Sequence, residues 1–343
     1  MKDAGLNIID IAVFAHNEED NIADILLELD QQDILESSDH SVNVYILANG
    51  CQDKTVTKAE GFLSQLNNSS AFSVHDLSLG GKSRTWNTFT HHISRADVGI
   101  LVFMDADISM PDGTTLRRLV KMLAENAQLD AVTSKPVKDI VINPVGLSPI
   151  DKVIAKAGGT LNDWRHSICG QLYAMRADTA RSFHLPIGLP VEDGFVRAMI
   201  TTSVLSETPT DRKIDGSDDV YHVYKSERSI AGLLRHQTRI VIGSAINATL
   251  FEVLRREDGS GIKSLLKVSS ENPEWLPGIL RNELPKAKSG WVPWHFLFKR
   301  INNFRHQASF KSKVIIILGF GFDAVAFVMA QIRMARGAGA GFW

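Results

Sequence analysis

Cysteine is scarce in this chain, since only Cys51 and Cys169 occur among 343 residues. Two cysteines exclude a disulfide framework and a four-cysteine zinc site, so a reducing compartment is expected. Net charge is nearly absent too, at −2, and 44% of the residues are hydrophobic, which excludes a disordered chain and a polytopic membrane protein. The apolar stretch 8–15 is short, contains Asp10 and follows no basic segment. It does not resemble a secretory signal, which predicts a cytoplasmic protein.

The near-neutral total conceals an uneven distribution of charge. Residues 281–343 contain ten Lys or Arg and two acids, a net charge of +8, and the first 280 residues carry a net charge of −10. Basic segments of this kind bind nucleic acid or the cytoplasmic leaflet of a membrane. Here the basic residues are interleaved with long apolar runs, which favours the membrane and argues against nucleic acid.

Strand and helix patterns alternate through residues 1–135. Apolar runs at 8–15, 44–48, 72–75 and 99–104 indicate strands, and residues at helical spacing follow each of them. This alternation predicts a parallel sheet with helices on both faces. The stretch 136–225 is richer in proline and is expected to continue the sheet with long loops, whereas 226–343 has a helical pattern.

Polar turns follow the four expected strands, at residues 16–20, 49–55, 79–83 and 105–107. Ligands of such sheets bind beyond the carboxyl ends of the strands, so these turns are expected to form one site. Asp105 and Asp107 are hard oxygen ligands that suit Mg²⁺ or Mn²⁺ bound to a diphosphate; the alternative is a solvated turn. The segment 80–82, Gly-Gly-Lys, suits either a phosphate or a helix entry, and Asn49 either a nucleobase contact or a simple turn.

Two further segments carry candidate side chains. Glu192 and Asp193 follow a proline-rich stretch, and one carboxylate there would serve as a general base or as the acidic start of a helix. His222 lies in the strand-like stretch 220–224, where it is a candidate third metal ligand or a structural histidine.

The turns, in this order, resemble family 2 glycosyltransferases of the GT-A fold. The resemblance covers about residues 8–240 and is carried by short segments that each match a motif of that family. These are Phe14–Glu19 (opening strand and turn), Leu47–Thr55 (nucleotide-reading turn, with Asn49 in place of the usual acid), Gly81–Lys82 (Gly-Lys turn), Met104–Asp107 (DxD motif), Ile168–Arg176 (strand before the acceptor site) and Glu192–Asp193 (Glu-Asp motif). Arg235–Arg239 partly resembles the Gln-x-x-Arg-Trp motif of processive synthases but lacks the tryptophan.

The resemblance implies a Rossmann-like mixed sheet with helices on both faces over residues 1–225, with a nucleotide-binding half at 1–135 and an acceptor half at 136–225. It implies inverting transfer of a sugar from a nucleotide diphosphate sugar to an acceptor hydroxyl, with Mg²⁺ or Mn²⁺. Asp193 would be the catalytic base, and Asp107 would bind the metal, with His222 as a candidate further ligand. The donor would be held by Ala15, Glu18, Asn49, Lys82 and Asp105. The acceptor side would include Glu192, Trp164 and Arg239.

The C-terminal region 226–343 is expected to associate with a membrane. Its segment 314–332 is long enough to cross about 30 Å of hydrocarbon, although Asp323 at its centre also fits a helix lying in the interface. Aromatic residues beside Lys299 and Arg300 suggest an interfacial anchor, at Trp291, Trp294, Phe296 and Phe298. A peripheral or single-pass protein on the cytoplasmic side, with a lipid-linked or cell-envelope glycan as acceptor, is therefore expected. The alternative is a helix packed on the catalytic domain or on a dimer partner.

Two other functions compete with the transferase. A sugar nucleotidyltransferase would carry a glycine-rich N-terminal loop, but His16–Glu19 stands there instead. A non-catalytic scaffold of the same fold would act through the basic C-terminal region; the retained Asp105, Asp107 and Asp193 argue against it.

Overall fold

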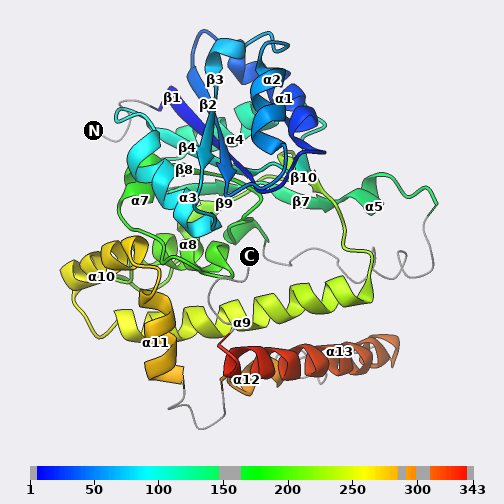
Figure 1. Cartoon of the computed structure of the whole chain (residues 1–343), viewed down its shortest axis with the longest axis vertical. Coiled ribbons are helices and arrows are strands. Elements are labelled where there is room, and N and C mark those ends of the chain that lie inside the picture. The colour runs from blue at the N-terminus through cyan, green and yellow to red at the C-terminus, as the bar shows by residue number, and fades with distance from the viewer. Residues whose placement is uncertain (1–5, 147–163, 285–290, 299–309, 338–343) are drawn as a thin grey trace. The chain divides into compact units, whose positions relative to one another are not determined.

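The computed structural model describes residues 6–146, 164–284, 291–298 and 310–337 (Figure 1). The chain divides into two compact units. The first comprises Met1–Leu185 and Asp193–Ser226, and the second comprises Pro186–Glu192 and Glu227–Trp343. The chain therefore passes from the first unit into the second and back again before it leaves the first unit for the last time.

A seven-stranded mixed sheet forms the centre of the first unit, in the order β3-β2-β1-β4-β8-β6-β9 (Figure 1). Strands β3, β2, β1 and β4 run parallel, and β8 is antiparallel to both β4 and β6. A second sheet has the order β5-β10-β7. The strands are β1 (Ile8–Ala15), β2 (Ser41–Asn49), β3 (Phe72–Leu77), β4 (Ile100–Asp105), β5 (Ile108–Ser109), β6 (Ala131–Thr133), β7 (Lys135–Lys138), β8 (Leu172–Arg176), β9 (Ile214–Asp215) and β10 (Tyr221–Tyr224).

Helices connect the strands. The helices are α1 (Ile22–Asp30), α2 (Thr55–Leu63), α3 (Lys82–Thr88), α4 (Thr115–Glu125), α5 (Asp139–Ile142), α7 (Ala177–Arg181) and α8 (Glu192–Thr201), with short turns η1 (Asp33–Leu35), η2 (Ser69–Ala71), η3 (Phe89–Ile93), η4 (Trp164–His166) and η5 (Asp211–Lys213). The helical segment that follows β3 is divided, because α3 ends at Thr88 and η3 continues it as a π-helical turn.

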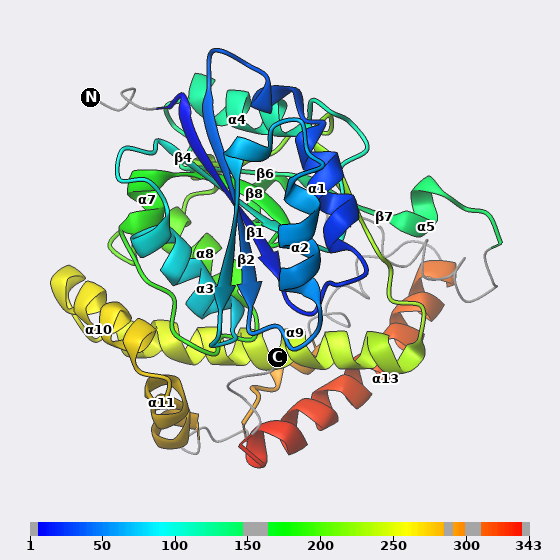
Figure 2. The same ribbon diagram turned by 45° about the horizontal axis from the view of Figure 1, so that its top comes forward.

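The two faces of the central sheet bury different side chains. Ile9, Ile11 and Val13 of β1 face one way and share a core with apolar residues of α1 and α4. On the other face, Phe103 of β4 stacks on Trp86 of α3 and on Tyr173 of β8. Helices thus cover both faces (Figure 2), and the mixed α/β fold expected from the resemblance is confirmed.

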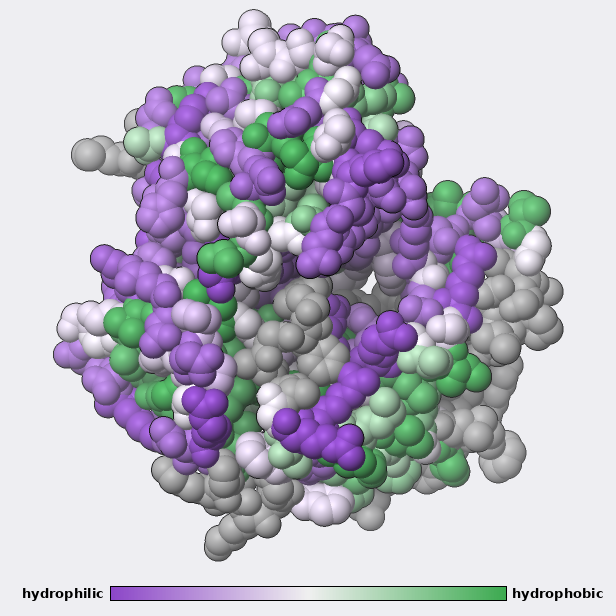
Figure 3. All heavy atoms as spheres, viewed as in Figure 1, coloured by the Kyte–Doolittle hydropathy of each residue, from purple (hydrophilic) through white to green (hydrophobic). Residues whose placement is uncertain are grey.

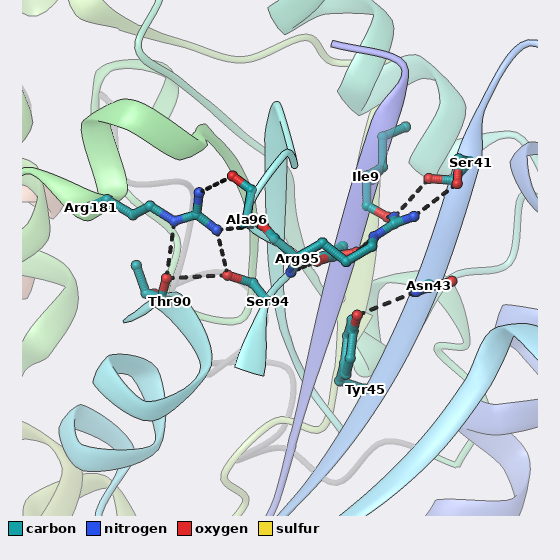
Figure 4. Close-up of polar contacts among 10 residues, drawn as sticks. Ile9, Ser41, Asn43, Tyr45, Thr90, Ser94, Arg95, Ala96 and Arg181 are labelled. Atoms are coloured by element: carbon teal, nitrogen blue, oxygen red, sulfur yellow. Dashed lines mark hydrogen bonds and ion pairs between the residues drawn. The ribbon is translucent and has the colours of Figure 1, made fainter. Parts of the chain in front are cut away.

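A buried ion pair lies near the amino ends of β1 and β2 (Figure 4). The Asp10 side chain is fully buried; its carboxylate accepts hydrogen bonds of 2.7 Å from Arg95 Nε and from the Arg95 backbone N–H. The same guanidinium donates to the carbonyl oxygens of Ile9 and Ser41. Burial raises the pKa of Asp10, while the hydrogen bonds and charge of Arg95 act in the opposite direction. The carboxylate therefore depends on Arg95 for its compensation.

The second unit is helical, as its sequence pattern indicates. Its helices are α9 (Ile230–Leu254), α10 (Gly259–Glu271), α11 (Trp275–Glu283), α12 (His295–Phe298) and α13 (Phe310–Ala335). Helix α13 packs against α9 and α12. In the part of the chain that the structure describes, we find no helix with the length and apolar character needed to cross a membrane. Helix α13 covers the predicted segment 314–332, but the side chains of 310–316 and 318 lie outside the described residues.

Candidate active site

The carboxyl ends of three parallel strands meet at one edge of the large sheet. In the strand register Ala15 of β1 lies opposite Ala48 of β2, and Phe14 lies opposite Asp105 of β4. Ala15, Asn49 and Asp105 are the last residues of their strands. The polar turns that follow are therefore neighbours, as the alternating sequence pattern predicts.

Hydrogen bonds join the turn after β1 to the turn after β2. His16 Nδ1 lies 2.6 Å from the carbonyl oxygen of Asn49, and the Gln52 backbone N–H donates to Asn17 Oδ1 over 2.8 Å. The Glu18 backbone N–H donates to Thr55 Oγ1 over 2.8 Å. Asn17 has a positive φ of 56°, a conformation that asparagine tolerates better than most residues. The two turns thus form one folded surface.

Glu18 projects toward the acidic residues of this edge. Asn21 Nδ2 donates to Glu18 Oε2 over 2.6 Å, and Lys225 Nζ donates to Asn21 Oδ1 over 2.7 Å. Burial raises the pKa of Glu18, and the nearby negative charge of Asp107 raises it further. Glu18 and Asp107 therefore lie close enough to interact, and the cation Lys225 lies near Glu18.

Asn49 fixes the glycine turn that precedes Lys82. The Asn49 side chain is buried, and its Oδ1 accepts a hydrogen bond of 2.8 Å from the Gly81 backbone N–H. Gly50 beside it has a φ of +61°, and a Cβ on Gly50 would come within 2.8 Å of the backbone N and Cα of Gly80. The turns after β2 and β3 can pack this closely only because both contact residues are glycine.

Replacing Gly50 with alanine is expected to destabilise the first unit by about 1–3 kcal/mol, because the positive φ is unfavourable and the new Cβ meets backbone atoms. Urea unfolding measures the loss of stability. Gly61→Ala is the matched control, because a Cβ on this helical glycine meets nothing within 4 Å. Equal stability of the Gly50 variant and the wild type would contradict the close approach of the two turns.

Lys82 and Asp105 form a partly buried ion pair. Lys82 Nζ lies 2.6 Å from Asp105 Oδ1, and the two side chains are 12% and 21% exposed. Lys82 Nζ also donates to the carbonyl oxygen of Gly170 over 3.0 Å, and the Asp105 backbone N–H donates to the carbonyl oxygen of Gln171 over 3.0 Å. The segment before β8 thus holds both partners. Sequence reasoning assigned no role to Gly170 and Gln171, because backbone acceptors leave no pattern in a sequence.

Asp107 and His222 occupy different surroundings. Asp107 is exposed, just before β5, which pairs with the strand that carries His222. His222 is buried, with Nδ1 3.0 Å from Ser134 Oγ and Nε2 3.3 Å from Gln171 Oε1. Burial lowers the pKa of His222 to about 3, so the imidazole is neutral, the form that binds metals. Both ring nitrogens already have polar neighbours.

The carboxylates near Asp107 suit a cation that takes only part of its coordination from the protein. Among the described residues no group of three or more His, Cys, Asp and Glu is arranged to hold a metal ion. Mg²⁺ commonly binds one or two carboxylates and takes its remaining ligands from phosphate and water. The exposed carboxylate of Asp107, with Asp105 and Glu18 near it, fits that kind of site.

The Cys169 thiol is influenced electrostatically both by the expected base, Asp193, and by two residues expected to hold the donor. Burial raises the pKa of Cys169 to about 12, and the charges of Asp193 and Asp105 add to the effect while that of Lys82 opposes it. These three charged groups therefore lie close enough to the Cys169 thiol to interact with it electrostatically. Asp193 is the second residue of α8, where its Oδ1 accepts a hydrogen bond of 2.7 Å from the Gly194 backbone N–H.

The three residues expected on the acceptor side are spread more widely. Trp164 is buried against Gly216, where an added Cβ would come within 2.4 Å of Trp164 Cζ3, so its ring packs inside the first unit. Glu192 is buried and belongs to the second unit with Arg239, which is half-buried on α9. Lys225 was missed, since a lysine directly after a short strand is an ordinary sequence feature.

Comparison with known proteins identifies the family. The sequence profile described as glycosyl transferase family 2 matches residues 10–194, more than half of the chain. The chain belongs to this family. It is therefore a glycosyltransferase of the GT-A fold that uses a nucleotide sugar. No curated protein sequence matches this glycosyltransferase.

The chain aligns with solved structures at low sequence identity. The mannosyltransferase PcManGT from Pyrobaculum calidifontis, in complex with GDP-Man and Mn²⁺, is 19% identical with a TM-score of 0.54; the alignment covers 94% of this chain and 86% of that one. Glucosyl-3-phosphoglycerate synthase from Mycobacterium tuberculosis, in complex with Mn²⁺, UDP-glucose and phosphoglyceric acid, is 19% identical with a TM-score of 0.44, over 66% of this chain and 74% of that one.

Proposed function

We propose that this glycosyltransferase moves a sugar, with inversion, from a nucleotide diphosphate sugar to an acceptor hydroxyl, and that Asp193 removes the hydroxyl proton. The observation that carries the proposal is that Asp193, Asp105 and Lys82 are all close enough to Cys169 to act on it electrostatically. A carboxylate beside the reacting centre activates a hydroxyl that is a weak nucleophile on its own. Attack from the side opposite the leaving diphosphate inverts the sugar carbon.

The donor would lie across the ends of β1, β2 and β4. In this proposal Ala15 and Asn49 line the nucleoside end, and Glu18 contacts the nucleotide. Lys82 and Asp105 meet the diphosphate and the sugar, and their ion pair of 2.6 Å keeps both side chains in place before the donor arrives. Lys225 adds a positive charge near Glu18.

A divalent cation, Mg²⁺ or Mn²⁺, would be held by Asp107 and the donor diphosphate. When bound, such an ion stabilises the negative charge that develops on the leaving diphosphate. The mannosyltransferase that shares the fold was solved with GDP-Man and Mn²⁺, which supports the same pairing here. His222 stays a candidate ligand whose ring would first have to give up its contact with Gln171.

The acceptor proposed is a lipid-linked or cell-envelope glycan, reached at the cytoplasmic side of a membrane. Support comes from the net charge of +8 over residues 281–343 and the aromatic residues within that segment. Glu192, Trp164 and Arg239 stay proposed for the acceptor side.

The test is thermal unfolding with nucleotide diphosphates and nucleotide sugars, each with and without Mn²⁺. A ligand at about 100 times its Kd adds about 2.7 kcal/mol to the stability of the native state. One nucleotide is expected to raise the melting temperature of the wild type in a metal-dependent way, and Asp107→Asn is expected to lose the metal-dependent part. Asp97→Asn, an exposed acid of the same unit, is the control.

Two results would count against the proposal. If no nucleotide stabilises folded protein in the presence of Mn²⁺, the chain does not use a nucleotide sugar under these conditions and the scaffold becomes the better interpretation. If Asp107→Asn responds like the wild type, Asp107 has no part in metal binding.

A further inference from the structure

Two polar residues of helix α13, Gln331 and Asp323, lie away from its most exposed residues. Gln331 Oε1 accepts hydrogen bonds from the backbone N–H groups of Trp291 and Val292, over 2.9 and 3.1 Å, and Gln331 Nε2 donates to the Val292 carbonyl oxygen over 2.7 Å. Asp323 is half-buried and points about 160° away from the exposed Val325 around the helix axis. Gln331 is therefore bonded within the second unit, and Asp323 lies on the side of the helix away from Val325.

The outward side of α13 is apolar instead. Four of its large hydrophobic residues are about half exposed, at 56% (Ile317), 49% (Val325), 55% (Val328) and 46% (Ile332). With Gly321 they recur every three or four residues, so they form one stripe along the helix. Every described residue between Ile317 and Ile332 that is classed as exposed belongs to this stripe. Figure 3 shows hydrophobic residues gathered at the surface where α9 and α13 lie.

Two aromatic side chains lie beside the stripe: Trp294, directly before α12, and Phe298, the last residue of α12. Trp294 is 53% exposed and Phe298 is 41% exposed. Their rings contact Phe327 and Phe320 of α13, with centroids 5.5 and 6.2 Å apart. Half-exposed aromatic rings beside an apolar helix are typical of the boundary between lipid and water.

We propose that the stripe of α13 (Ile317, Gly321, Val325, Val328 and Ile332), with Trp294 and Phe298, lies in the interface of an anionic lipid bilayer, with the helix axis parallel to the membrane plane. The stripe enters the acyl boundary and the polar side of α13 stays with the second unit. Burial of this face against lipid removes apolar surface from water.

The net charge of residues 281–343 favours an anionic lipid surface, rather than a second copy of the chain, as the partner of the stripe. Residues 281–343 carry a net charge of +8, which anionic headgroups attract. A second copy would bring an equal positive charge to the same contact. The orientation follows from Asp323, because a spanning helix would carry that carboxylate into hydrocarbon and remove the contacts of α13 with α9.

The inference rests on the proposed function only for its purpose, which is to bring the enzyme to a lipid-linked acceptor. Vesicle binding needs no donor, metal or acceptor. Its failure is therefore distinguishable from failure of sugar transfer.

The experiment is flotation of the full chain with vesicles of equal parts phosphatidylglycerol and phosphatidylcholine, and with phosphatidylcholine alone. The wild type should float with the anionic vesicles, less so as salt rises, and should be extracted by alkaline carbonate. Val325→Asp with Val328→Asp should lower the partition coefficient about tenfold or more, because two apolar contacts are replaced by charge. Val268→Asp on α10 is the control, since Val268 is 47% exposed and lies outside the stripe.

Several results would overturn the proposal. Wild-type protein that does not float, or a double variant that floats as well as the wild type, removes the stripe from membrane binding. Resistance to carbonate contradicts the in-plane orientation. A concentration-dependent dimer that the double variant loses would assign the stripe to a second copy. Circular dichroism shows whether each variant is folded. The Val325→Ala, Val328→Ala double variant adds no charge and should float with reduced affinity, which separates these outcomes from misfolding.

Discussion

Replacing Asp193 with asparagine is expected to lower kcat by about 10²–10⁴-fold and to leave donor binding nearly unchanged. A positioned general base contributes about that much to a rate. Asparagine keeps the size of the side chain and an oxygen that can accept the Gly194 N–H hydrogen bond, but it cannot take up the acceptor proton. Steady-state kinetics give kcat, and calorimetric titration with the nucleotide gives the donor Kd.

Asp178→Asn is the matched control, because Asp178 is an acid in the first turn of α7 in the same unit, exposed to solvent. It should retain wild-type kinetics. A fully active Asp193→Asn enzyme would exclude Asp193 as the base. Loss of donor binding together with kcat would instead assign Asp193 a structural role at the start of α8.

Arg95→Met is expected to cost about 3–5 kcal/mol of unfolding free energy, the largest stability effect we expect from a single substitution. The Asp10 carboxylate is fully buried and would lose the guanidinium, and removing one partner of a buried pair leaves an uncompensated charge. Urea unfolding at neutral pH measures the loss. Arg117→Met is the control, because the Arg117–Asp33 pair is 50% and 36% exposed and such pairs contribute about 1 kcal/mol or less.

The stability deficit of Arg95→Met is expected to depend on pH. Burial raises the pKa of Asp10, and removal of Arg95 raises it further. A carboxyl whose folded-state pKa is raised stabilises the protein most below its unfolded pKa and loses that contribution as the pH rises through the folded pKa. The stability deficit of Arg95→Met should therefore shrink as the pH falls. A deficit that is constant with pH, or that Asp10→Asn in the same chain does not reduce, would contradict this account.

The parallel half of the fold was predictable because its signals are local. Each of β1, β2, β3 and β4 is a short apolar run followed by residues at helical spacing, and the polar turns had to share one edge. The direction of β8 was not predictable from its residues, because an apolar run such as Leu172–Met175 does not encode whether its neighbour runs parallel or antiparallel. The π-helical turn at Phe89–Ile93 likewise keeps a helical apolar pattern.

The residue types of the site were predictable, but their contacts were not. Asn49 was expected to contact a nucleobase or to form a simple turn. The hydrogen bond from the Gly81 N–H to its side-chain oxygen is a contact that no spacing rule indicates. Asp323 looked costly within an apolar segment because sequence alone does not tell which side of a helix faces the protein. Both cases depend on contacts between residues distant in sequence.

The chain passes through the second unit between Leu185 and Asp193, and this limits how such enzymes can be divided into separate domains. Pro186–Glu192 belongs to the second unit, where the Ile187 N–H bonds the Ser269 carbonyl and Asn247 Nδ2 bonds the Val191 carbonyl. Truncation after Ser226 would remove the second-unit hydrogen-bond partners of these seven residues. The seven residues directly precede the proposed base, Asp193. The helical unit therefore cannot be removed as one continuous segment, and exchanging it between relatives would require three junctions, one of them directly before the proposed base.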